Sequence, residues 1–147
     1  SPALGEIRKT GKILTDAGQV SEWGAPTFEV WVARKDFAEK HPEIVEKFAK
    51  VSLDAIADYN ANQAAWTADS DKVQKIAALT GANAADVPEL LHGAHFPSTA
   101  EQKSPQLLGA GTAKDIAQTA LFLKEQGKIE SVLPDYSGYV SDKYLPE

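Results

Sequence analysis

The feature that most constrains this fold is one alternating segment in a chain whose other patterns are helical. The stretch APTFEVWVARKDF covers residues 25–37. Read as an extended chain, it sends alternate side chains to opposite sides. The apolar side consists of Phe28, Val30 and Val32. The opposite side consists of Thr27, Glu29, Trp31 and Ala33. The segment is therefore a predicted strand over about residues 26–34. One of its sides is apolar, and the other carries a carboxylate next to an indole.

The rest of the chain favours helices. Apolar residues recur at spacings of three and four after Pro42, which predicts a long amphipathic helix through about residue 62. Helices are also predicted over residues 69–81, 84–93 and 111–127, the last with a Thr112 cap, and a final one in the tail at 136–145. Residues 12–16 offer a second, brief strand. The sequence predicts an α/β chain that is mostly helical with one or two short strands.

So few strands cannot satisfy their own backbone groups in a stable sheet. We therefore expect the sheet partners to lie upstream, in a longer protein. The chain contains no methionine, so Ser1 is not a natural translation start, which agrees with that expectation. As it stands, the chain should form a single compact unit. We expect it to leave apolar surface exposed, pair with a second copy, or rearrange its helices.

Composition excludes several classes of protein. The net charge of -6 argues against binding to nucleic acid, which requires concentrated positive charge. It also disfavours a polybasic membrane-surface protein. The chain has no cysteine, which removes disulfides, thiol nucleophiles and cysteine-ligated zinc.

Glu29 and Trp31 are the leading candidates for a binding site. A carboxylate beside an aromatic face suits an alkylammonium group, because the acid gives charge-assisted hydrogen bonds and the ring adds ~0.5–2 kcal/mol of cation–π attraction. The alternative is an exposed edge where Glu29 meets water and Trp31 packs sideways. The pattern alone leaves both interpretations open.

Other constellations point away from catalysis and metal binding. His92 and His95 are spaced i, i+3, but Gly93 should end the helix between them and no third ligand lies nearby. His41 is interpreted as the residue before the long helix. The chain lacks a strained serine elbow and a glycine-rich phosphate loop. We therefore expect no enzyme activity, no cofactor and no metal.

Longer stretches carry a resemblance to a known family. QVSEWGAPTFEVWVARKDFAEKHPE, residues 19–43, and FLKEQGK, residues 122–128, are its most specific pieces, and KIAALTGANAADVPELLHG at 75–93 extends it. The chain resembles the C-terminal half of the taurine-binding periplasmic proteins of ABC importers, in the nitrate/sulfonate/taurine group of type II solute-binding proteins. The similarity covers all of this chain and about half of a family member.

The resemblance implies a C-terminal fragment of a type II periplasmic binding protein, whose two lobes close over a ligand. It implies that residues 1–25 form the end of the second lobe and the hinge region. Residues 26–147 would supply the crossing strand and C-terminal helices of the first lobe.

The function implied is a periplasmic component that delivers taurine or a related aliphatic sulfonate to a membrane permease. Glu29 stands where taurine-binding members carry an acid suited to the ammonium group, with Trp31 and Thr27 as further ligand-binding candidates. The member compared has aspartate there, so the longer glutamate side chain implies a different pocket size. An alternative is an enzyme or binding protein for thiamine precursors on the same lobe fold, although the histidines fall outside the strand.

Overall fold

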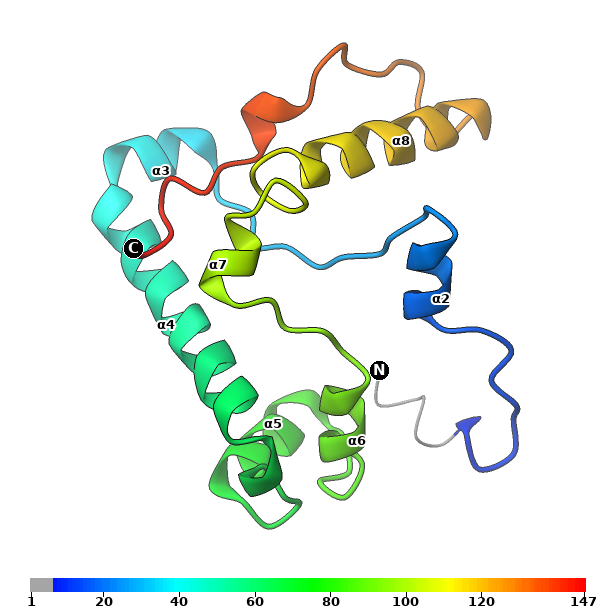
Figure 1. Cartoon of the computed structure of the whole chain (residues 1–147), viewed down its shortest axis with the longest axis vertical. Coiled ribbons are helices and arrows are strands. Elements are labelled where there is room, and N and C mark those ends of the chain that lie inside the picture. The colour runs from blue at the N-terminus through cyan, green and yellow to red at the C-terminus, as the bar shows by residue number, and fades with distance from the viewer. Residues whose placement is uncertain (1–6) are drawn as a thin grey trace. The chain divides into compact units, whose positions relative to one another are not determined.

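Helices are the regular elements of the computed structural model, which describes residues 7–147 (Figure 1). The α-helices are α2 (Ala17–Glu22), α3 (Lys35–Lys40), α4 (Pro42–Ala61), α5 (Asp71–Thr80), α6 (Val87–His92), α7 (Thr99–Gln102) and α8 (Gly111–Glu125). Two single 3-10 turns are η1 (Gln63–Ala65) and η2 (Ser137–Tyr139). The prediction of a mostly helical chain is confirmed.

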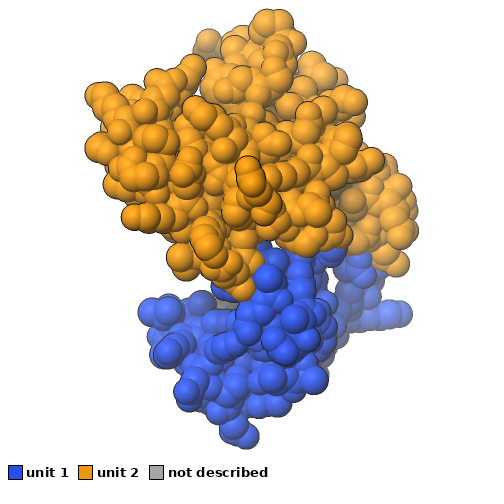
Figure 2. Space-filling model, turned by 60° about the vertical axis from the view of Figure 1, so that its left-hand side comes forward, with its two compact units in different colours: residues 1–16, 55–96 blue, residues 17–54, 97–147 orange. Residues whose placement is uncertain are grey.

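The chain divides into two compact units, each described by itself (Figure 2). The first contains residues up to Asp16 together with 55–96, and the second contains 17–54 and 97–147. The boundary at residue 54 falls inside α4, so this helix contributes its first turns to the second unit and its last turns to the first. The assignment of residues 1–25 and 26–147 to different lobes stays a prediction.

Local sequence signals account for the first unit. α4 begins at Pro42, whose fixed φ and missing N–H suit a first helical position. α5 starts after Ser70, whose hydroxyl accepts a hydrogen bond from the Val73 amide, and ends at Gly81 with φ 72°. α5 packs on α6, and the buried side chains of this unit are Tyr59, Val73 and Val87.

In the second unit, α7 is set by a capping box between Ser98 and Glu101. The predicted Thr112 cap of α8 is wrong: the helix begins one residue earlier, at Gly111, and Thr112 is buried in its first turn. The preceding turn explains the difference. Its carbonyls at Pro105 and Leu107 already accept the amides of Gly111 and Thr112, so no side-chain cap is required there.

The tail prediction was also wrong, because η2 is a single turn rather than a helix. Asp135 accepts hydrogen bonds from both the amide and the hydroxyl of Ser137. Such local side-chain bonds compete with helix propagation. The sequence also predicts a short helix over residues 1–12, from Pro2 in its first turn to Gly11 near its end, and half of it falls on residues 1–6, outside the described part of the chain.

The predicted strands are not found in residues 7–147. In the described part of the chain, residues 26–34 and 12–16 are assigned neither to a helix nor to a strand. A strand is defined by hydrogen bonds to a neighbouring strand. An alternating sequence predicts only an extended conformation, which could pair with a neighbouring strand if one were present. Within residues 7–147, the backbone N–H and C=O groups of 26–33 bond to no other backbone group.

Apolar surface stays exposed on the second unit, which was one of the three expected outcomes. Large apolar side chains at the surface include Phe28, Val30, Trp31, Val32, Ile44, Phe48 and Val51. Among the described residues, no helix combines the length and the apolar character needed to cross a bilayer.

Candidate functional site

The three predicted site residues share one extended segment between α2 and α3. The segment starts after Gly24, which leaves α2 with φ 88°, a value that glycine adopts without strain. It ends at Arg34, whose φ of -62° and ψ of 134° are extended, just before α3 begins at Lys35. Pro26 and the β-branched valines between these points disfavour helix and hold the chain extended.

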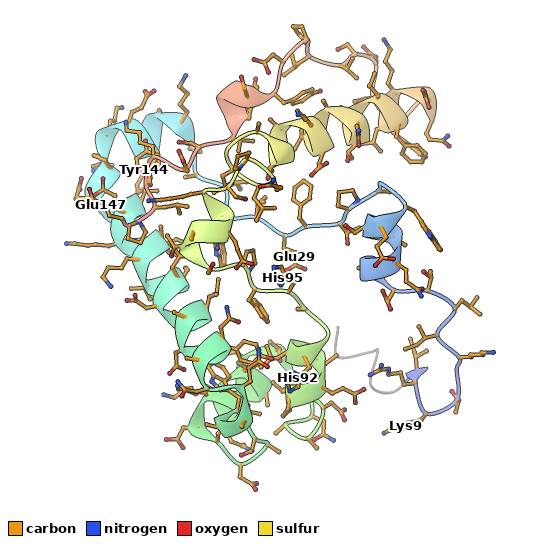
Figure 3. All side chains as sticks on the ribbon, in the orientation of Figure 1. Lys9, Glu29, His92, His95, Tyr144 and Glu147 are labelled. Carbon is orange, nitrogen blue, oxygen red and sulfur yellow. The ribbon has the colours of Figure 1, made fainter. Side chains whose placement is uncertain are left out.

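Glu29 and Thr27 lie on this segment with their side chains exposed to solvent. Figure 3 shows the Glu29 carboxylate extending away from the ribbon. Within the described residues, it forms no ion pair and no hydrogen bond. Its negative charge is therefore available to a ligand.

Trp31 packs sideways against α4. The Trp31 and Phe48 ring centroids lie 5.0 Å apart with the planes at 89°, an edge-to-face contact. Such pairs contribute about 0.5–1.5 kcal/mol beyond the area they bury. The indole is nevertheless 79% exposed, so most of its surface remains free.

The nearest basic residue along the chain is already paired. Arg34 donates to both carboxylate oxygens of Asp36, from Nε at 3.0 Å and from Nη2 at 2.6 Å. This guanidinium holds the pKa of Asp36 below its usual value, because the two charge-assisted bonds favour the carboxylate. Arg34 is thus committed to Asp36.

The histidines do not assemble a metal site. His92 ends α6 and His95 follows the turn at Gly93, so the two do not share a helical face (Figure 3). His41 precedes α4, with its Nδ1 3.9 Å from Glu43 Oε1. In the described part of the chain, no cluster of three or more histidine, cysteine, aspartate or glutamate side chains could hold a metal ion.

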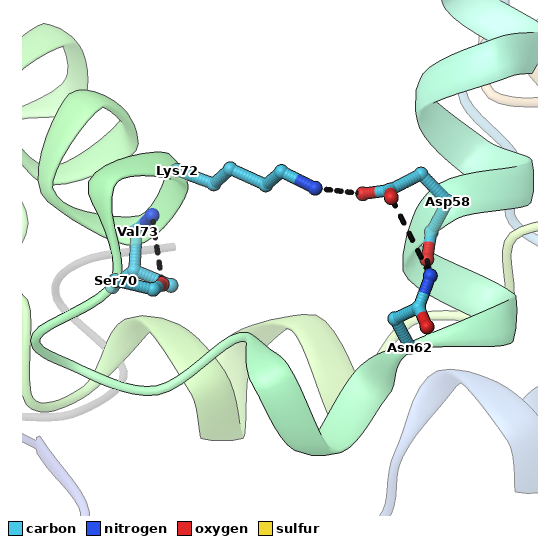
Figure 4. A network of polar contacts seen from close by, with 5 residues as sticks. All are labelled: Asp58, Asn62, Ser70, Lys72 and Val73. Atoms are coloured by element: carbon cyan, nitrogen blue, oxygen red, sulfur yellow. Dashed lines mark hydrogen bonds and ion pairs between the residues drawn. The ribbon is translucent and has the colours of Figure 1, made fainter.

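Sequence reasoning missed a polar network in the first unit (Figure 4). Lys72 at the start of α5 forms an ion pair with Asp58 in the last turns of α4, and the Asn62 amide lies 3.5 Å from the same carboxylate. The Lys72 ammonium also stands 5.0 Å from the centre of the Trp66 ring. The separation of 14 residues between Lys72 and Asp58 leaves no local pattern that could have revealed the pair.

A surface hollow in the second unit was also not anticipated. Its volume is about 280 Å³, and it lies between the start of α8 and the tail. Its lining includes Ala113, Ala117, Lys114, Pro134 and Asp135. The Asp135 carboxylate is already bonded to Ser137, whose donors lower its pKa. The hollow therefore lacks the free carboxylate found at Glu29.

Comparisons with known proteins concern the chain as a whole. No family model matches the chain. The chain is 47% identical over 145 residues to the taurine-binding periplasmic protein of Escherichia coli (strain K12). The match covers 99% of this chain and 45% of that protein, so the chain spans less than half the length of its relative. Over nearly all of its own length, this chain is similar to a taurine-binding periplasmic protein.

Proposed function

We propose that this chain forms part of a periplasmic solute-binding protein that delivers taurine, or a related aliphatic sulfonate, to the membrane permease of an ABC importer. The observation that carries the proposal is the 47% identity over 99% of the chain to a taurine-binding periplasmic protein. The role is binding rather than catalysis. The name of the relative describes a binding protein, and nothing in the comparisons supports a thiamine-precursor enzyme.

Glu29 is the residue proposed to bind the ligand's ammonium group. Taurine is a short zwitterion, so a site that selects it over a plain alkanesulfonate needs an acid placed for the ammonium group. The Glu29 carboxylate has no partner among residues 7–147 and stays at the surface, which leaves it open to a charge-assisted bond. A neutral side chain there would leave a buried ammonium unpaired, at a cost of several kcal/mol.

Trp31 is proposed as the wall of the same site. Its contact with Phe48 holds the ring edge-on, and its exposed face could meet the ligand's ammonium through cation–π attraction. Thr27 precedes Glu29 by two residues on the same side of the extended chain, so its hydroxyl is a third candidate contact.

The proposed setting is the two-lobed type II fold, in which a ligand is enclosed between lobes. Residues 26–34 would then join a sheet supplied by other parts of a protein of the relative's length. This chain would carry the amine half of the site and little of the sulfonate half. We expect the 147-residue chain alone to bind taurine weakly or not at all.

A chimera tests the proposal directly. This chain replaces the matching stretch of the E. coli relative, and calorimetry measures binding of taurine, ethanesulfonate and an aliphatic amine. Glu29→Gln should weaken taurine binding at least about tenfold, which corresponds to ~1.4 kcal/mol, and should leave ethanesulfonate binding unchanged or improved. Glu39→Gln, an exposed acid on α3, is the matched control and should change neither affinity.

The outcomes separate two claims. A folded chimera that binds none of the three compounds, while the E. coli protein binds taurine, would overturn the proposed function. Taurine binding that survives Glu29→Gln unchanged would leave the function standing and remove Glu29 from the site.

A further inference from the structure

The contact between Trp31 and Phe48 joins the extended segment to a helix. Trp31 lies on the segment between α2 and α3, Phe48 lies in α4, and both belong to the second unit. The ring centroids are 5.0 Å apart and the planes are at 89°. All of α3 separates the two residues in the sequence, so the contact belongs to the tertiary structure of this unit and no local pattern predicts it.

This contact shows which side of the segment faces that turn of α4. Alternation places Glu29 and Trp31 on one side of an extended chain, and Phe28 and Val30 on the other. Because Phe48 touches Trp31, its ring lies on the side that carries the Glu29 carboxylate. Phe48 therefore borders the candidate site, although it was not among the residues predicted from the sequence.

We propose that Phe48 is a positioning residue of the ligand site. Its ring sets the orientation of the Trp31 indole, and the indole in that orientation meets the ammonium group of the ligand. This inference rests on the proposed function, because it requires Trp31 to contact the ligand. It does not require Phe48 to touch the ligand itself.

Phe48 is the more constrained of the two side chains. It lies inside the 20-residue α4, where the preceding turn of the helix disfavours one of the three χ1 rotamers. Its side chain is 48% exposed, whereas that of Trp31 is 79% exposed. Among the described residues, Phe48 supplies the only aromatic ring in contact with Trp31. The helix therefore restrains the indole more than the indole restrains the helix.

The contact has the same effect if the segment is a paired strand in a longer protein. Backbone hydrogen bonds to a neighbouring strand fix φ and ψ, but they leave χ1 and χ2 of an exposed side chain free. An edge-to-face ring contact restricts those two torsions directly. The inference therefore does not depend on whether residues 26–34 have a partner strand.

An oriented indole should bind an ammonium group more tightly than a mobile one. Cation–π attraction requires the cation over the ring face, within about 6 Å of its centroid. An indole that changes rotamer meets this condition only part of the time, and the ligand must then immobilise it. Phe48 restricts the indole before the ligand arrives, so this ordering cost is reduced. The cost of immobilising one side chain corresponds to about two- to tenfold in affinity.

Calorimetry of the chimera with the E. coli relative tests the role of the ring. Phe48→Leu keeps an apolar side chain without the ring, so it should weaken taurine binding about two- to tenfold. Ethanesulfonate has no ammonium group, so its affinity should not change. Phe48→Tyr keeps the ring at a half-exposed position, where the added hydroxyl can reach water, and should bind taurine like the wild type.

Phe37→Leu is the matched control for the loss of a ring. Phe37 lies in α3 of the same unit, is 42% exposed, and its ring contacts His41 rather than Trp31. The control variant should change neither the taurine affinity nor the ethanesulfonate affinity. An equal loss of taurine affinity in Phe37→Leu and Phe48→Leu would contradict a specific role of Phe48.

A double-mutant cycle separates a positioning role from a merely structural one. In a Trp31→Leu background there is no indole to orient, so Phe48→Leu should have no further effect on taurine affinity. If the losses of the two single variants simply multiply in the double variant, Phe48 acts independently of Trp31 and the inference is overturned.

Time-resolved fluorescence anisotropy of the 147-residue chain tests the contact without a ligand. In a Trp23→Phe, Trp66→Phe background, Trp31 is the only tryptophan. Phe48→Leu should increase the amplitude of the sub-nanosecond decay, which reports the motion of the indole itself. Phe48→Tyr and Phe37→Leu should leave this amplitude unchanged, and circular dichroism verifies that all variants keep their helices. An unchanged amplitude in Phe48→Leu would overturn the positioning role even if the chimera does not fold.

The outcomes distinguish this inference from the proposed function. A folded chimera that binds none of the three compounds would overturn the function, and the positioning role with it. A chimera that binds taurine but is insensitive to Trp31→Leu would keep the function and refute the positioning role. The same conclusion holds if Phe48→Leu weakens taurine and ethanesulfonate binding equally.

Discussion

Replacement of Val73 by alanine should destabilise the first unit by about 2 kcal/mol. Val73 is completely buried in α5, and Val87 of the neighbouring α6 is 2% exposed. Loss of two methyl groups costs ~1.6 kcal/mol at ~0.8 kcal/mol each. A cavity of roughly 50 Å³ adds about 1 kcal/mol at ~24 cal/mol per Å³. The better helix propensity of alanine returns about 0.5 kcal/mol.

The assay is urea unfolding followed by circular dichroism and by tryptophan fluorescence in a Trp23→Phe, Trp31→Phe background, where the remaining Trp66 reports on the first unit. Leu79→Ala is the control, because it truncates an apolar side chain of the same helix, in the same unit, that is 87% exposed. The control should stay within about 0.5 kcal/mol of the wild type. Equal stabilities of the two variants would show that Val73 does not occupy a packed core, and the reasoning from burial would fail.

Two further predictions concern single contacts. The Lys72 ammonium holds the pKa of Asp58 below its ordinary 3.8, so the stability from this pair is present above that value and is lost as the pH falls through the lowered folded pKa. In urea titrations at neutral pH, Asp58→Asn should therefore have a smaller free energy of unfolding than the wild type. This difference in free energy should shrink below about pH 3.8. A difference that does not change with pH would contradict a stabilising ion pair. Gly81→Ala should cost about 1–2 kcal/mol in thermal melts, because φ at this position is 72° and nothing crowds an added Cβ. Gly138→Ala, also uncrowded but without a positive φ, should be neutral or slightly stabilising, and a similar loss in both would refute the backbone explanation.

Local signals predicted most helices correctly. Pro42, Ser70 and Gly81 act on backbone groups within one turn of themselves, so the sequence alone places α4 and α5. The same logic failed at Thr112. There, two carbonyls of the preceding turn accept hydrogen bonds from the first amides of α8. No residue pattern in the sequence predicts that arrangement.

The candidate site was also predicted only in part from the sequence. Alternation identified Thr27, Glu29 and Trp31 as neighbours on one side of an extended segment. It left two interpretations of Trp31 open, and the contact with Phe48 shows that the indole does pack sideways while most of its surface stays exposed. The ligand contacts of all three residues stay a prediction.

The sequence by itself determined α4, α5, α6 and α8 and the extended conformation of residues 26–34, because caps, proline, glycine and periodicity act over a few residues. Its longer stretches also indicated the likeness to a taurine-binding protein. Only the tertiary structure decided that Lys72 meets Asp58, that Glu29 has no partner within residues 7–147, and that the predicted strand stays unpaired there. Those outcomes depend on which distant groups come within reach, and a local pattern carries no information about distance through space.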